Sequence, residues 1–81
     1  GVNFRWFVRD SAVQLHLTGW VQNVSDGTVA VLAEGEEDAL KRFIDICVVG
    51  SEMALVEKVE EVWKEIHHRE YTDFQIRRSL V

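Results

Sequence analysis

Apolar residues recur at helical spacing near the start of the chain, and this periodicity predicts a helix over residues 4–15. A second helix is predicted to begin at the acidic residues 36–38, because negative charge suits a helix N-terminus. Gly50-Ser51 is expected to end it. The apolar stripes are Phe4, Val8, Ala12 and Leu15 in the first helix, and Leu40, Phe43, Ile44, Cys47 and Val48 in the second.

Strands are predicted over residues 17–24 and 28–33. In the second, Val29, Val31 and Ala33 alternate with Ala30, Leu32 and Glu34, as in a sheet that is covered on one face. Ser25-Asp26-Gly27 lies between the two strands, and Asp-Gly is a strong hairpin signal because glycine tolerates positive φ. A further strand is predicted over residues 55–63, followed by a polar loop and a short closing strand over residues 74–77. The predicted order is therefore α-β-β-α-β-β.

Composition restricts the classes of protein to which the chain can belong. Its 81 residues, 47% of them apolar, predict one domain over residues 1–81. The net charge of −5 argues against a nucleic-acid partner, and no apolar run approaches the ~20 residues of a membrane span. Cys47 is the only cysteine, so no intrachain disulfide is expected, and we predict a cytoplasmic location.

Two short stretches carry the candidate chemistry. Gly1-Val2-Asn3-Phe4-Arg5 is predicted to form a turn that leads into the first helix. Unpaired N–H groups at a helix start attract anions, and an arginine fork matches phosphate oxygens two at a time. This segment is interpreted as a phosphate cradle. The later strand is expected to place the uncharged Asn23 at its end, beside the cradle.

These two stretches together resemble the acylphosphatase family. Its signature is Gly-Val-x-Phe-Arg, then, after one helix, Gly-Trp-Val-x-Asn and a turn ending in Asp-Gly. Both halves are present in order, at residues 1–5 and 19–27. Residues 33–40, 56–59 and 72–77 also resemble the family's second helix start, its fourth strand and its closing strand. The resemblance covers essentially the whole chain.

The resemblance implies the fold as well. We expect an α+β, ferredoxin-like α/β sandwich, with an antiparallel sheet and two helices on one face. The family has a strand ahead of the phosphate loop, and that strand is not among these residues. We therefore expect a monomer if the chain is complete and a strand-exchanged dimer if it is truncated.

The resemblance also implies an activity, the metal-independent hydrolysis of acyl phosphates to carboxylate and inorganic phosphate. Arg5 matches the family's phosphate-binding arginine and Asn23 its water-positioning asparagine. The backbone of Gly1, Val2, Asn3, Phe4 and Arg5 corresponds to the phosphate-binding loop. The expected ligand is a small acyl phosphate or inorganic phosphate, and no metal or cofactor is expected. Val24 departs from the family, which often has a hydroxyl residue there.

Other interpretations of the sequence stay open. The missing first strand suits a non-catalytic anion-binding or interaction module of the same fold, or an inactive fragment of a larger protein. His67-His68, with acidic neighbours, suggests either a metal site or a solvated loop, and adjacent residues on a strand face opposite ways. Trp6, Phe7 and Trp20 are expected to pack rather than to form a stacking platform. His16 is expected to cap a helix end, and Cys47 to be buried.

Overall fold

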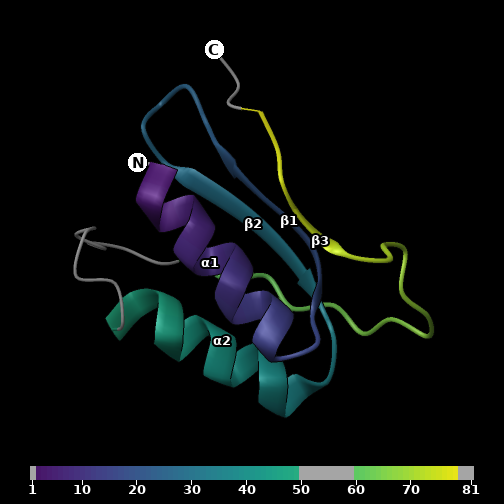
Figure 1. Cartoon of the computed structure of the whole chain (residues 1–81). Helices are drawn as coiled ribbons and strands as arrows, with labels where there is room; N and C mark the ends of the chain where they lie inside the picture. Colours follow the sequence, from purple (N-terminus) through teal and green to yellow (C-terminus); the bar gives the residue numbers. More distant parts are fainter. Residues whose placement is uncertain (1, 50–59, 79–81) are drawn as a thin grey trace.

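A computed structural model describes residues 2–49 and 60–78, and two helices cover one face of a three-stranded sheet (Figure 1). The two helices and the hairpin lie where periodicity predicted them, with ends displaced by one or two residues. The predicted end of the second helix at Gly50-Ser51 lies outside the described residues. The elements in chain order are α1 (Val2–Gln14), β1 (Thr18–Asn23), β2 (Val29–Glu34), α2 (Glu37–Val49) and β3 (Phe74–Ile76).

The sheet has the strand order β2-β1-β3, so β1 is its central strand. β1 and β2 form an antiparallel hairpin in which Asn23 lies opposite Val29. β3 runs parallel to β1, with Phe74 opposite Gly19. The prediction of an antiparallel sheet was therefore wrong for this pair, and the sheet is mixed. Alternation of apolar residues fixes the face that a strand buries, but it does not fix the direction of the strand.

The strand predicted over residues 55–63 is not found in the part of it that the structure describes. Residues 60–63 have no regular secondary structure, and residues 55–59 lie outside the described ranges. Val62 is 97% exposed, so its side chain is not packed against a sheet face. β-Propensity reflects packing on a neighbouring strand, and an alternating pattern is not enough without that strand.

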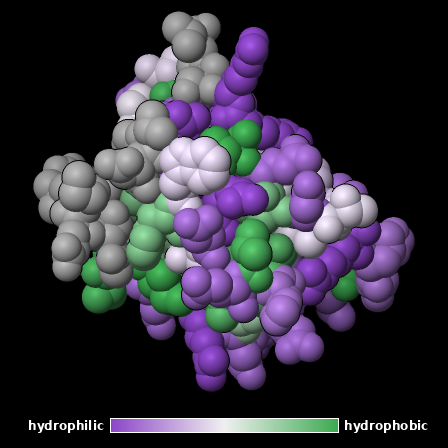
Figure 2. Space-filling model, in the orientation of Figure 1, coloured by the Kyte–Doolittle hydropathy of each residue, from purple (hydrophilic) through white to green (hydrophobic). Residues whose placement is uncertain are grey.

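The core lies between the helices and the sheet. Phe43 of α2 meets Phe74 of β3 edge-on, with ring centroids 6.0 Å apart. Cys47 packs against the cluster but is only partly buried, and burial raises the pKa of its thiol to about 11. The outer side of the helices is mostly polar, with apolar patches between (Figure 2). The buried cluster is Val8, Ala12, Leu17, Val21, Phe43 and Phe74.

α1 ends in a Schellman motif that places His16 in the left-handed region. The N–H of Leu17 donates to the Ala12 carbonyl at 2.9 Å, and the N–H of His16 donates to Val13 at 3.1 Å. His16 has φ 59°, and among the described residues it is the single non-glycine residue with positive φ. His16 therefore lies at the helix end as expected, and its backbone conformation forms the cap.

We expect His16→Gly to stabilise the protein, because glycine adopts this conformation without the steric cost of a Cβ atom. The gain should be about 1 kcal/mol, or about 5 °C in the melting temperature of a domain this small. Thermal unfolding of the two proteins measures it. His16→Ala is the matched control, since alanine also lacks the imidazole but keeps the Cβ atom. A gain of the same size in His16→Ala would contradict this explanation.

Candidate active site

The first turn of α1 offers unpaired backbone donors. The helix begins at Val2. The turn predicted over residues 1–5 is therefore wrong for residues 2–5, which are helical, and Gly1 lies outside the described residues. The N–H groups of Val2, Asn3 and Phe4 have no acceptor within an α-helix that begins here. The first turn of α1 also contains no acidic residue, whereas that of α2 contains Glu37 and Asp38. The positive end of the α1 dipole is therefore not neutralised by its own side chains.

Arg5 extends from this turn toward the C-terminal strand. Its Nη1 donates a hydrogen bond to the carbonyl oxygen of Arg77 at 3.4 Å. Its Nε is buried and has no hydrogen-bond partner among the described residues. A guanidinium has five N–H donors, so residues 2–49 and 60–78 leave most of this group's donors without an acceptor. A phosphate or carboxylate oxygen is the kind of acceptor that would use it.

Asn23 is the last residue of β1 and lies half-buried at the start of the hairpin turn. Its side-chain amide makes no hydrogen bond within the described part of the chain. The turn itself is held by backbone bonds, from Val24 N–H to Thr28 O at 2.9 Å and from Gly27 N–H to Val24 O at 3.0 Å. Asp26 also accepts from the Thr28 hydroxyl and N–H, which lowers the pKa of its carboxyl group. The backbone of Asn23 is thus fixed by the hairpin, and its amide has no partner among the residues that the structure describes.

The fold brings these groups to one end of the sheet. The start of α1 lies beside the end of β1 and the start of β2 (Figure 1). Arg77, whose carbonyl accepts from Arg5, donates its own N–H to Val21 O at 2.8 Å. Arg5 is therefore connected through Arg77 to Val21, two residues before Asn23 on the same strand.

The contacts of Arg5 with the C-terminal strand have no counterpart among the motifs of the sequence. Arg77 provides the acceptor, and Gln22 Nε2 donates to the Arg78 carbonyl at 2.8 Å. Trp20 is half-buried as expected, and the Arg77 guanidinium lies over its ring at 4.5 Å. Trp6 is 51% exposed under Arg9, so the prediction that it packs was wrong. No sequence signal distinguished Arg77 from an ordinary surface arginine.

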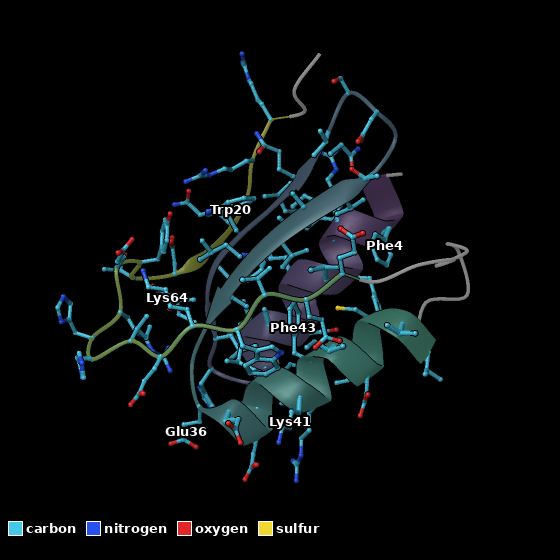
Figure 3. The ribbon with its side chains drawn as sticks, turned by 180° about the vertical axis from the view of Figure 1, so that it is seen from behind. Phe4, Trp20, Glu36, Lys41, Phe43 and Lys64 are labelled. Carbon is cyan, nitrogen blue, oxygen red and sulfur yellow. The ribbon has the colours of Figure 1, made fainter. Side chains whose placement is uncertain are left out.

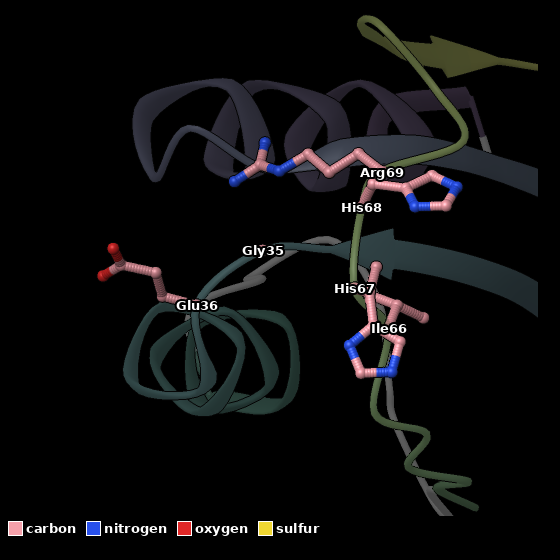
Figure 4. Close-up of a pocket in the computed structure, with 6 residues that line it drawn as sticks. All are labelled: Gly35, Glu36, Ile66, His67, His68 and Arg69. Carbon is pink, nitrogen blue, oxygen red and sulfur yellow. The ribbon is translucent and has the colours of Figure 1, made fainter.

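The opposite end of the sheet has a shallow hollow of about 210 Å³ that is not part of this arrangement. His67 and His68 line it and are both exposed, and the side chains around it point in different directions (Figure 4). No group of three His, Cys, Asp or Glu side chains within residues 2–49 and 60–78 is placed to hold a metal ion. We therefore assign no site to this hollow.

Comparison with known proteins identifies the family. The family described as Acylphosphatase matches residues 1–76. The acylphosphatase of Caldanaerobacter subterraneus subsp. tengcongensis is 41% identical over 76 residues, covering 94% of this chain and 83% of that protein. The acylphosphatase of Moorella thermoacetica is 41% identical over 80 residues, covering 99% of this chain and 84% of that protein.

Solved structures agree with the sequence comparison. The crystal structure of acylphosphatase from Bacillus subtilis superposes with a TM-score of 0.84 at 36% identity, covering 95% of this chain and 84% of that one. The Coxiella burnetii acylphosphatase superposes with a TM-score of 0.80 at 42% identity, covering 95% and 79%. The predicted ferredoxin-like α+β fold class is thereby confirmed. The chain belongs to the acylphosphatase family.

Proposed function

We propose that the protein hydrolyses acyl phosphates, with the start of α1 and Arg5 binding the phosphoryl group and Asn23 orienting water. The observation that carries this proposal is the Arg5 guanidinium. Arg5 lies in the first turn of α1, which has no acidic residue, and its buried Nε is unpaired among the described residues. Its Nη1 contacts Arg77, which pairs with Val21 on the strand that Asn23 ends. Family membership supports the same reaction.

The proposed reaction needs binding and alignment more than a protein nucleophile. The oxygen of water attacks phosphorus, the bond from phosphorus to the acyl oxygen breaks, and its electron pair leaves on the carboxylate. Both water protons end on the phosphate or the solvent. Backbone N–H groups of Val2, Asn3 and Phe4, together with the Arg5 fork, would neutralise the phosphoryl oxygens. Such interactions are preorganised, because the helix and the Arg77 contact fix their directions.

Asn23 suits the positioning of water because its amide offers both a donor and an acceptor. The amide does not titrate between pH 4 and 9, so activity that depends on it should show a flat profile around neutral pH. Neither role calls for a metal ion. Metal-independent turnover is accordingly part of the proposal and is tested with it.

The test is the hydrolysis of a simple aromatic acyl phosphate in the presence of a chelator. Arg5→Gln should lower kcat/KM by about 10²–10³-fold and weaken inhibition by inorganic phosphate. Asn23→Ala should lower kcat by about 10²-fold while inhibition by phosphate is kept. The variant loses the side chain that positions water but keeps the groups that bind the phosphoryl group.

Each variant has a matched control. Arg9→Gln removes the same charge one turn further along α1, where Arg9 contacts Asp10 at 3.3 Å. Ser25→Ala alters an exposed residue of the same hairpin turn. Both controls should keep wild-type turnover. If the wild type does not hydrolyse the substrate, or if Arg5→Gln behaves like Arg9→Gln, the non-catalytic anion-binding interpretation replaces this one.

Three further expectations belong to this proposal. We propose that residues 1–81 act as one domain and that small anionic acyl phosphates, not nucleic acids, are its ligands, which the net charge of −5 supports. We propose a cytoplasmic location, which the single cysteine supports. Within the described residues, the helices are too short and too polar to cross a membrane. Sedimentation would distinguish a monomer from a strand-exchanged dimer.

A further inference from the structure

We propose that Arg77 is a positioning residue for Arg5, and that the rings of Trp20 and Tyr71 hold Arg77 in place for this purpose. The proposal rests on the phosphate-binding role proposed for Arg5. Its starting point is the hydrogen bond from Arg5 Nη1 to the Arg77 carbonyl oxygen, which joins residues 72 positions apart in the sequence. Arg77 acts through its backbone, and its side chain determines where that backbone lies.

The backbone of Arg77 is placed by only a few bonds. β3 is a strand of three residues, and Arg77 follows its last residue, Ile76. The Arg77 N–H donates to Val21 O at 2.8 Å, which leaves its carbonyl free to accept from Arg5. Strand ends of this length fray readily, because few ladder bonds oppose the entropy of the chain. A second restraint is therefore needed to keep the carbonyl in one direction.

The side chain of Arg77 supplies that restraint. Its guanidinium carbon lies 4.5 Å from the centroid of the Trp20 ring and 5.9 Å from that of the Tyr71 ring. The two rings are joined by a hydrogen bond from Trp20 Nε1 to the Tyr71 hydroxyl at 3.3 Å. Trp20 lies on the face of the sheet that is turned away from the helices (Figure 3). Arg77 is thus held by aromatic rings on one face while its carbonyl receives Arg5.

The consequence for Arg5 is a loss of freedom before the ligand binds. An arginine side chain has many rotamers, and ordering it when an anion arrives weakens binding. Anchoring Nη1 leaves Nε and the remaining N–H groups pointing in a fixed direction. Nε is also the atom that is buried without a partner among the described residues, so the anchored side chain presents an unused donor.

The test compares Arg77→Met with Arg78→Met in the purified protein. Methionine keeps the backbone bonds and an unbranched apolar stem but removes the guanidinium. Arg78 is the matched control, because it is the next residue and carries the same charge, and its side chain stacks on neither ring. Arg77→Met should weaken inhibition by inorganic phosphate about three- to tenfold and raise KM similarly. Arg78→Met should change either value less than twofold.

The double variant with Arg5→Gln separates positioning from general charge attraction. If Arg77 acts through Arg5, Arg77→Met should have no further effect on kcat/KM in the Arg5→Gln background. An equal loss in Arg77→Met and Arg78→Met, or a loss that persists without Arg5, would overturn the proposal. If Arg5→Gln itself leaves turnover and phosphate inhibition unchanged, then it is the proposed function that fails.

A second pair of variants covers the case in which Arg77→Met does not fold. Tyr71→Leu removes one of the rings, whereas Tyr71→Phe keeps the ring and removes the hydroxyl that accepts from Trp20. Phosphate inhibition should weaken in Tyr71→Leu and stay close to wild type in Tyr71→Phe. Equal phosphate inhibition in these two variants would also overturn the proposal.

Discussion

Gly19→Ala is expected to lower the free energy of unfolding by about 4 kcal/mol or more, which is most of the stability of a small domain. Gly19 is buried in the central strand with φ 140°, a conformation that residues with a side chain rarely adopt. A Cβ atom there would overlap the Leu32 carbonyl oxygen and lie 2.8 Å from its carbon. Both atoms are backbone of the paired strand, so β2 would have to move. Denaturant unfolding followed by tryptophan fluorescence measures the loss.

Gly27→Ala is the matched control for this prediction. Gly27 also has positive φ, 88°, but a Cβ atom there would meet nothing within 4 Å. It should therefore show only the conformational cost, about 1 kcal/mol. If Gly19→Ala lost no more stability than Gly27→Ala, the close approach of β1 and β2 at Leu32 would not be the reason that glycine is needed.

Glu34→Gln is expected to destabilise the protein by about 3 kcal/mol, because Glu34 is a buried carboxylate that accepts several hydrogen bonds. The side chain is 6% exposed at the end of β2. It accepts from the Thr18 hydroxyl at 2.8 Å, from Glu70 N–H at 2.8 Å and from Tyr71 N–H at 3.1 Å. A glutamine amide keeps the shape but directs an N–H₂ group at one of these donors. Chemical denaturation at neutral pH measures the difference.

The pH dependence of stability should reveal the same carboxylate. Burial raises the pKa of Glu34, but the bonds from Glu70, Thr18 and Tyr71, together with the charge of Arg69, outweigh it and leave the pKa lowered. The ionised group therefore stabilises the fold above its ordinary pKa of 4.5, and this contribution is lost as the pH falls through the lowered folded value. The gap in stability between wild type and Glu34→Gln should narrow below pH 4.5.

Glu37→Gln controls for the loss of a carboxylate as such. Glu37 is exposed and pairs with Lys41 at 3.3 Å on the surface of α2, so its removal should cost about 0.3–0.5 kcal/mol.

Glu34 connects residues 70 and 71 to the sheet, because it accepts hydrogen bonds from their N–H groups. Glu34→Gln should therefore also speed tryptic cleavage after Arg69 at neutral pH, whereas Glu37→Gln should not. Equal cleavage rates in the two variants would argue against this role of Glu34.

The sequence predicted the elements whose signals are local. The apolar stripe of α1 and the Asp26-Gly27 turn each depend on neighbouring residues, and both were confirmed. The direction of β3 and the absence of a strand over residues 60–63 depend on which segments meet in space. Alternation carries no information about pairing partners, so the antiparallel prediction for β3 and the strand prediction for residues 60–63 were wrong for the same physical reason.

The candidate site was predictable to a similar extent. Arg5 and Asn23 are candidates because the motifs around them match those of the family, and their roles stay predictions. Their supports were not found. Arg77 contributes a carbonyl oxygen, which every residue possesses, and Glu34 was expected on an alternating strand but proved to be a buried acceptor. Roles that depend on backbone atoms or on distant donors leave no pattern in the sequence.

The pairing of β1 with β3 has a consequence for the synthesis of the protein. Gly19 lies opposite Phe74, and Arg5 contacts Arg77. These contacts of β1 and α1 can form only after the C-terminal residues have been synthesised. On a ribosome, α1 and the β1–β2 hairpin emerge and can fold while the edge of β1 that pairs with β3 has no partner strand. Arg5 therefore lacks its contact with Arg77 until residue 77 has been synthesised. A stalled or prematurely released nascent chain would carry Arg5 and Asn23 but not the contact that orders them.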